Sequence, residues 1–293
     1  MKEFDYVRPS SLEEACEALV CDDQSVKPLA GGTDLLVQMR EGGLRPRGLV
    51  SLRDVPGLRF IRSNDDGSLE IGAATTLSAI ERSQEVREHF PAIAEAASFI
   101  GSVQVRDRAT IGGNLCNAAP SADTAPILIA YGALATISDG RHERTVPLEE
   151  FFTGPSETVL KPGELLVSLT VPPPPARTFG KYYKTFRSAM DCCTVGVGVC
   201  AVFADGSGVL QDVRLVMGAV APTPMRAREC EELLRGRALD DELIARVGAR
   251  AAEEIKPIDD VRAAAAYRRV LAAVLTRRAL AAARSWAQKG AVA

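Results

Sequence analysis

Two glycine-containing stretches hold the residues of this chain that are best suited to binding chemistry. The first, AGGTDLLVQMR, covers residues 30–40, and the second, ATIGGNLCNAAPSADTAP, covers residues 109–126. A glycine pair that follows a strand exposes backbone N–H groups, and a helix that begins there adds the positive end of its dipole. Such a turn suits a phosphate group. Each stretch taken alone is better explained as an ordinary tight turn.

Polar side chains make the second stretch the richer of the two. An exposed hydroxyl at Thr110 can hydrogen-bond a phosphate, and Asp123 can accept from a sugar hydroxyl. Alternatively, Asp123 only complements the dipole of the helix that begins beside it. We expect Ser121 to cap that helix, which runs to Tyr131. Both interpretations of Asp123 remain open from the residues alone.

Several classes of chemistry lack the residues they need. Neither stretch contains G-x-G-x-x-G or a P-loop, and the chain has no G-x-S-x-G elbow. Its two histidines lie far from both stretches, and its seven cysteines form no C-x-x-C pair. We therefore predict no catalytic side chain, no metal site and reduced thiols. An enzyme of this kind would need a cofactor to carry the reaction.

The bulk composition limits the partners and the location. The 293 residues are 46% hydrophobic and carry a net charge of -3 with both signs interspersed, so no basic field for nucleic acid is expected. No stretch approaches the roughly 20 apolar residues that span a bilayer, and the first residues do not resemble a signal peptide. We expect a cytoplasmic protein of two domains.

Periodicity and turn signals predict alternating helices and strands in the first half of the chain. A Ser11-x-x-Glu14 capping box begins a helix that buries Cys16, and Pro91 begins another helix. A third helix is expected to be capped by one of the hydroxyl residues Thr75, Thr76 and Ser78. Strands are expected at 26–30, which should be buried, 48–52, and 164–172.

A run of four prolines, Pro172–Pro175, can neither continue a strand nor enter a helix, and it predicts a domain boundary. Beyond it, segments typical of strands predict a three-stranded antiparallel meander with a turn at 204–208. These segments are 179–186, 194–203 and 209–220. Helices are then expected at 225–236, 240–255 and 259–288.

The last predicted helix has an apolar stripe and an arginine-rich side. The stripe consists of Ala263, Ala266, Tyr267, Val270, Leu271, Val274 and Leu275. The opposite side carries Arg268, Arg269, Arg277, Arg278 and Arg284. We interpret the arginines as a solvated face, with a partner-binding role as the alternative.

Five blocks of the sequence carry a family resemblance. In order they are LAGGTDLLVQMR, ATIGGNLCNAAPSADTAP, FFTGPSETVLKPGELLVSLTVP, YYKTFRSAMDCCTVGVG and AVAPTPMRA. Together they resemble the FAD-binding medium subunit of the molybdenum hydroxylases over nearly the whole chain. The likeness is closest to bacterial xanthine dehydrogenase FAD-binding subunits and extends to carbon monoxide dehydrogenase medium subunits. AGGTDLL differs from the AGGHSLL typical of the latter.

The resemblance implies an α+β fold. Residues 1–175 would form a vanillyl-alcohol oxidase-type (PCMH-type) FAD-binding domain, with subdomains at about 1–53 and 54–175. Residues 176–293 would form a C-terminal flavoprotein domain with a three-stranded antiparallel sheet and helices.

The resemblance also implies the cofactor contacts. The two glycine stretches would hold the pyrophosphate of FAD, bound non-covalently because neither contains a histidine. The implied cofactor-binding residues are Leu29, Ala30, Gly31, Gly32, Thr33, Asp34, Leu35, Ile100, Gly101, Thr110, Ile111, Gly112, Gly113, Asn114, Asp123, Leu166 and Lys184. Asp191 would lie near the electron acceptor or cap a helix or strand. We interpret Cys192 and Cys193 as the start of a buried strand, with a redox role as the alternative.

The function implied is electron relay. A molybdopterin-binding large subunit would oxidise the substrate, and a small subunit with [2Fe-2S] clusters would pass electrons to FAD in this chain. FAD would then reduce NAD+ or another acceptor. The alternatives are a flavin subunit serving another N-heterocycle, an aldehyde, carbon monoxide or an acyl-CoA, and a non-catalytic nucleotide-binding module.

Overall fold

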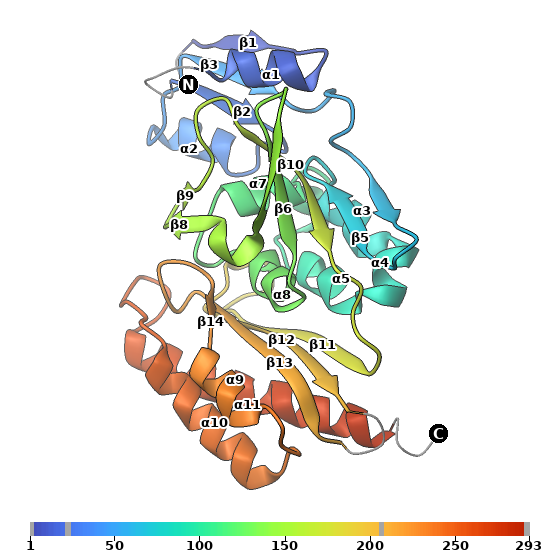
Figure 1. The fold of residues 1–293 in the computed structure, drawn as a ribbon. Coiled ribbons are helices and arrows are strands. Elements are labelled where there is room, and N and C mark those ends of the chain that lie inside the picture. The colour runs from blue at the N-terminus through green and yellow to red at the C-terminus, as the bar shows by residue number, and fades with distance from the viewer. Residues whose placement is uncertain (1–2, 21–24, 205–207, 290–293) are drawn as a thin grey trace.

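The computed structural model describes residues 3–20, 25–204 and 208–289. Its ribbon has three parts stacked one below another, an N-terminal sheet, a central sheet with helices, and a C-terminal sheet with helices (Figure 1). Strands and helices occur in every part, as the predicted α+β class requires. None of the described helices is long and apolar enough to cross a membrane.

The N-terminal part is a small parallel sheet with two helices. Its elements are β1 (Asp5–Val7), α1 (Leu12–Ala18), β2 (Val26–Leu29), α2 (Leu35–Glu41) and β3 (Gly48–Ser51), in sheet order β1-β3-β2. The hydroxyl of Ser11 accepts from the N–H of Glu14 and caps α1, as predicted, and Cys16 is buried. β2 is only half-buried, contrary to prediction, because it is an edge strand with a neighbour on one side.

The central part is built on an antiparallel sheet in the order β4-β5-β10-β6-β7. Helices α3, α4, α5, α7 and α8 share one hydrophobic cluster with β5, β6 and β10. The predicted start of α5 at Pro91 is confirmed, and Thr76 is the residue that caps α3. The elements are β4 (Ile61–Ser63), β5 (Leu69–Gly72), α3 (Leu77–Arg82), α4 (Gln84–His89), α5 (Pro91–Ser98), α6 (Val103–Arg106), α7 (Ile111–Cys116), α8 (Thr124–Ala130), β6 (Leu134–Ser138), β7 (Glu143–Pro147), η1 (Leu148–Glu150), β8 (Phe152–Gly154), β9 (Glu157–Thr158) and β10 (Leu165–Val171).

The C-terminal part contains the predicted meander with one addition. β11 (Thr178–Thr185), β12 (Val195–Phe203) and β13 (Leu210–Gly218) pair antiparallel in that order. A two-residue strand, β14 (Met225–Arg226), pairs with β13, so the expected helix at 225–236 begins later, as α9 (Arg228–Leu234). α10 (Asp241–Glu254) and α11 (Ala265–Lys289) follow. The predicted turn at 204–208 lies mostly outside the described residues.

Helix α8 joins the central and C-terminal parts because glycines on the C-terminal sheet let it approach closely. A Cβ at Gly198 would lie 2.8 Å from the backbone of Pro126, and one at Gly180 would lie 1.9 Å from the hydroxyl of Tyr131. Every residue of α8 is buried. A side chain on either glycine would therefore push the sheet off the helix.

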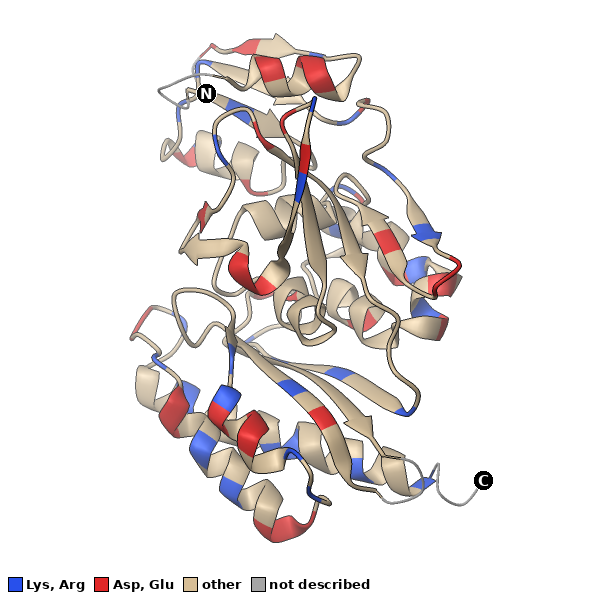
Figure 2. Ribbon diagram, viewed as in Figure 1, with Lys and Arg blue, Asp and Glu red and all other residues tan. Residues whose placement is uncertain are grey.

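The predicted apolar stripe of α11 is correct only in part, because Leu275 is buried and Leu271 packs against the core while other members are exposed. Tyr267 and Val270 are 56% and 57% exposed, whereas Arg268 is 3% exposed. Arg268 donates to the carbonyls of Thr194 (2.5 Å) and Ala219 (2.9 Å) and pairs with Asp260. Beyond Arg268, the buried side of the helix consists mainly of small residues together with two leucines, and it packs on the C-terminal sheet and α10. These are Ala272, Leu275, Thr276, Ala279, Leu280, Ala283 and Ala287. Arg277 and Arg278 are exposed, as predicted; α9 and α10 carry both acidic and basic residues, whereas the charged residues of α11 are all basic (Figure 2).

Candidate cofactor site

The first glycine stretch forms the turn between β2 and α2. Gly32 takes a left-handed conformation with φ 77°, which favours glycine. In the described chain the backbone N–H groups of residues 31–35 donate to no protein atom, while the N–H of Leu36 returns to the carbonyl of Gly32. Asp34 stands at the N-cap position of α2 without a capping bond. The turn thus offers a row of donors to an anionic ligand.

The second stretch does not offer such donors, contrary to prediction. Gly112 and Gly113 lie in the first turn of α7, after the N-cap Thr110, rather than in a turn before the helix. Their N–H groups donate to the carbonyl of Ala73 (2.8 Å) and to the hydroxyl of Thr110 (3.0 Å). A Cβ at Gly112 would lie 2.7 Å from the carbonyl oxygen of Ala73. Gly112 therefore serves packing inside the protein.

Thr110 also differs from its prediction, because its side chain is buried rather than exposed. The residue is 4% exposed, and its hydroxyl oxygen is already an acceptor in the capping bond. The hydroxyl proton remains available to donate to a ligand acceptor.

The two stretches touch each other. A Cβ at Gly31 would lie 2.2 Å from the carbonyl oxygen of Arg108 and 2.8 Å from the Cα of Ala109, the residue before Thr110. The donor row of the first turn therefore lies against the start of α7. Backbone contact at this point explains a glycine at position 31 independently of any ligand.

A buried ion pair lies beside the start of α8. The Nζ of Lys184 is 2.9 Å from Oδ2 of Asp123, and the two side chains are only 2% and 7% exposed. The Tyr182 hydroxyl donates to Oδ1 of Asp123 (2.8 Å). Burial raises the pKa of Asp123, and Lys184 and Tyr182 oppose that rise. Burial and the charge of Asp123 raise the pKa of Tyr182, so its phenol keeps the proton that it donates.

Tyr182 is a site residue that sequence reasoning missed. Alternate residues of a strand share one face, so the strand segment YYKTF already placed residues 182 and 184 together.

The capping prediction for Ser121 is wrong, because α8 begins at Thr124 and Asp123 holds the N-cap position.

The turn that contains Ile100 and Gly101 lies next to this ion pair. Lys184 also donates to the carbonyl of Phe99 (3.0 Å). Gly101 is left-handed with φ 50°, and Nη1 of Arg106 donates to the carbonyls of both Ile100 and Gly101 (3.2 Å each).

The remaining predicted contacts lie in the surrounding core. Oδ1 of Asn114 accepts from the hydroxyl of Thr124 (2.6 Å), which ties α7 to α8. Leu166 is buried in β10, in the hydrophobic cluster that also holds Ile111.

The segment from Arg187 to Cys193 leads into β12. Asp191 accepts from Arg187 (2.8 Å) and from the N–H of Cys192 (2.9 Å), so both of these bonds lie within its own segment. Cys193 is buried, and burial raises its pKa above the ordinary thiol range. Cys192 is exposed, so only one of the two thiols starts the buried stretch as predicted.

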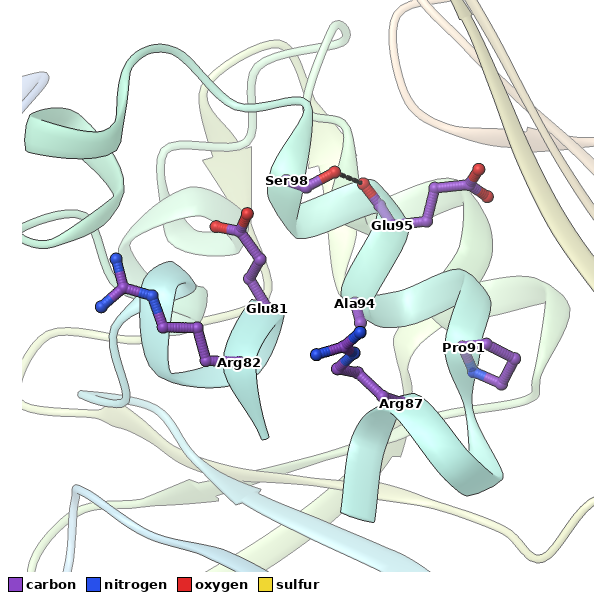
Figure 3. A pocket seen from close by; sticks show the side chains of 7 residues that line it. All are labelled: Glu81, Arg82, Arg87, Pro91, Ala94, Glu95 and Ser98. Atoms are coloured by element: carbon purple, nitrogen blue, oxygen red, sulfur yellow. Dashed lines mark hydrogen bonds between the residues drawn. The ribbon is translucent and has the colours of Figure 1, made fainter. Parts of the chain in front are cut away.

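A surface hollow of about 540 Å³ lies among α3, α4 and α5 (Figure 3). Its lining residues are Glu81, Arg82, Arg87, Pro91, Ala94, Glu95 and Ser98. It contains no residue of either glycine stretch. Its acidic residues are engaged elsewhere, since Glu81 pairs with Arg106 and Glu95 with Lys181.

Comparisons with known proteins identify the family to which both parts of the chain are similar. Residues 2–174 match the family described as the FAD binding domain in molybdopterin dehydrogenase, and residues 181–283 match the CO dehydrogenase flavoprotein C-terminal domain. A xanthine dehydrogenase FAD-binding subunit from Escherichia coli O157:H7 is 34% identical, over 94% of each chain. Caffeine dehydrogenase subunit beta from Pseudomonas sp. is 30% identical, over 95% of this chain and 94% of its own.

A solved structure has the same fold. It is a carbon monoxide dehydrogenase from Hydrogenophaga pseudoflava that lacks the Mo-pyranopterin moiety of its molybdenum cofactor. One of its chains superposes with a TM-score of 0.92 at 33% identity, covering 97% of this chain and 98% of that one.

The fold and these matches define an FAD-binding subunit of an oxidoreductase. The chain belongs to the family of FAD-binding domains of molybdopterin dehydrogenases, followed by the C-terminal domain of the CO dehydrogenase flavoproteins. Its relatives are subunits of dehydrogenases, which argues against a non-catalytic module.

Proposed function

We propose that this chain is the electron-relaying FAD subunit of a three-subunit molybdenum hydroxylase. It receives electrons from [2Fe-2S] clusters of a small subunit, while a molybdopterin-binding large subunit oxidises the substrate. NAD+ is the proposed acceptor. The observation that carries the proposal is the row of unused N–H groups at residues 31–35, which lies against the start of α7.

The residues present fit FAD. Free N–H groups and a following helix suit the pyrophosphate, and the absence of histidine from both stretches fits non-covalent binding. Bound FAD supplies the two-electron chemistry that no side chain of the site can provide.

Two groups of residues would position FAD in different ways. Residues 29–35 would bind its pyrophosphate, whereas Ile100, Gly101 and residues 110–114 would line its path. The buried pair of Asp123 and Lys184 holds charge at fixed points where few waters screen it.

Lys27 adds a cation that sequence reasoning did not select. It lies two residues before Leu29, on the same face of β2, and the side chain of Leu29 approaches Gly32. Lys27 is half-buried, and no carboxylate of the described chain pairs with it. We place it near the phosphates.

The division of the chain at Pro172–Pro175 stays part of the proposal. It gives an FAD-binding domain of residues 1–175 with subdomains at about 1–53 and 54–175, and a C-terminal domain of residues 176–293. The cytoplasmic location likewise stays a prediction from the sequence.

The first experiment measures FAD in the purified full-length chain. We expect FAD to be released intact on denaturation and to rebind the apoprotein. Lys27→Met should weaken rebinding by roughly tenfold, equivalent to about 1.4 kcal/mol, while Lys161→Met on an exposed loop should not. A chain that neither carries nor binds FAD contradicts the proposal.

The second experiment addresses substrate and acceptor. The xanthine and caffeine dehydrogenase relatives support a purine-type N-heterocycle. In the intact complex, xanthine should bleach the flavin absorbance and NAD+ should restore it. Bleaching by carbon monoxide or an aldehyde instead would assign another substrate and leave the FAD role standing.

A further inference from the structure

The turn formed by residues 99–102 is held by two buried cations. Lys184 donates to the carbonyl of Phe99 at 3.0 Å, and Arg106 donates to the carbonyls of Ile100 and Gly101 at 3.2 Å each. Three consecutive peptide oxygens are therefore bound by charged donors. Hydrogen bonds of this type are about twice as strong as neutral ones.

A carboxylate fixes Arg106 in turn. Its Nε lies 2.7 Å from Oε2 of Glu81, and the Arg106 side chain is only 10% exposed. Glu81 lies on α3 and Arg106 on α6, so the ion pair ties the turn to a helix of the central core.

The carbonyl bonds set the direction of two N–H groups. In a planar trans peptide the N–H points opposite to the C=O. Because the oxygens of Ile100 and Gly101 face Arg106, the N–H groups of Gly101 and Ser102 point away from it. Neither N–H has an acceptor in the described chain. Consecutive N–H groups next to a left-handed residue form an anion-binding concavity, and Gly101 has φ 50°.

This pair of donors lies close to the proposed pyrophosphate turn. Helix α6 has four residues and is thus about 6 Å long. The N-terminus of α6 follows Ser102. Arg108 and Ala109, just after its C-terminus, contact Gly31. One short helix therefore separates two sets of unused N–H groups.

We propose that Arg106, held by Glu81, is a positioning residue that fixes the 99–102 turn so that its two free N–H groups bind an acceptor atom of FAD. The inference rests on the proposed function. Arg106 does not touch the cofactor itself and acts through the backbone that it holds.

The test compares Arg106→Met with a matched control. Arg144 repeats the arrangement away from the site, since it pairs with Glu164 (2.7 Å) and donates to the carbonyl of Val159 (2.9 Å). In the full-length chain, Arg106→Met should weaken FAD binding roughly tenfold and alter the visible circular dichroism of the bound flavin. Arg144→Met should leave both unchanged, whatever its effect on the unfolding temperature.

Two milder variants cover the case in which Arg106→Met does not fold. Arg106→Lys keeps one charged donor and should restore part of the affinity, and Glu81→Gln should weaken binding about threefold. Wild-type affinity and an unchanged flavin spectrum in both folded variants would overturn the inference while the proposed function stands. Loss of affinity in Arg144→Met equal to that in the Arg106 variants would also overturn it. A wild-type chain that binds no FAD refutes the proposed function instead.

Discussion

Replacing Gly31 with alanine tests the contact on which the site is built. The new methyl carbon would lie 2.2 Å from the carbonyl oxygen of Arg108 and 2.8 Å from the Cα of Ala109, whereas ordinary contacts begin at 3.4 Å. Both opposing atoms are backbone, so the two glycine stretches must separate by roughly 1 Å. Overpacking of this size costs about 1–3 kcal/mol. For a chain of this length that lowers the unfolding temperature by roughly 2–10 °C.

The assay measures both stability and cofactor binding. Thermal unfolding of the apoprotein reports the steric cost, and FAD titration reports the displaced N–H groups, for which we expect at least about a tenfold loss of affinity. Gly43→Ala is the matched control, because its Cβ would meet only the carbonyl oxygen of Gln38 at 3.8 Å. If the Gly31 and Gly43 variants unfold at the same temperature and bind FAD equally, the two stretches do not meet as described.

Three further outcomes follow from the ion pairs. Lys184→Met leaves a buried carboxylate without its cation, so urea unfolding should show a loss of about 3–5 kcal/mol; a loss below about 1 kcal/mol contradicts the pair. Arg144 holds the pKa of Glu164 below its ordinary value of 4.5, so the stability from this pair is present above that pH and lost below it. The difference in unfolding temperature between wild type and Glu164→Gln should therefore narrow from about pH 7 to about pH 3, and a constant gap would refute this. Arg268→Met strips the donor from two carbonyls and should cost about 1–3 kcal/mol, whereas a solvated arginine would cost almost nothing.

Local signals were sufficient for much of the fold. The Ser11 capping box, the proline at the start of α5 and the alternating valines of β12 are signals of structures that neighbouring residues determine. Helix α6 escaped prediction because four residues are too few to show a helical period. It is nevertheless the helix that links the 99–102 turn to Gly31.

Helix α11 shows where hydrophobic periodicity did not predict the full buried face of a helix. Its many alanines give little contrast between its faces, so the larger residues Tyr267 and Val270 suggested the wrong buried side. Which side of α11 is buried depends on the surface that the helix packs against. The sheet and α10 accept small side chains at close range, and the carbonyls of Thr194 and Ala219 provide acceptors for Arg268.

For the site, the sequence by itself determined that two glycine stretches and a few polar residues had to matter, because glycine freedom and helix starts are local properties. Only the tertiary structure decided their roles. It leaves the N–H groups at residues 31–35 without an acceptor among the described residues, while those of Gly112 and Gly113 bind inside the protein. It also joins Asp123, Tyr182 and Lys184. Whether a donor finds an acceptor depends on segments that are distant in the chain, so local sequence patterns do not predict these hydrogen bonds.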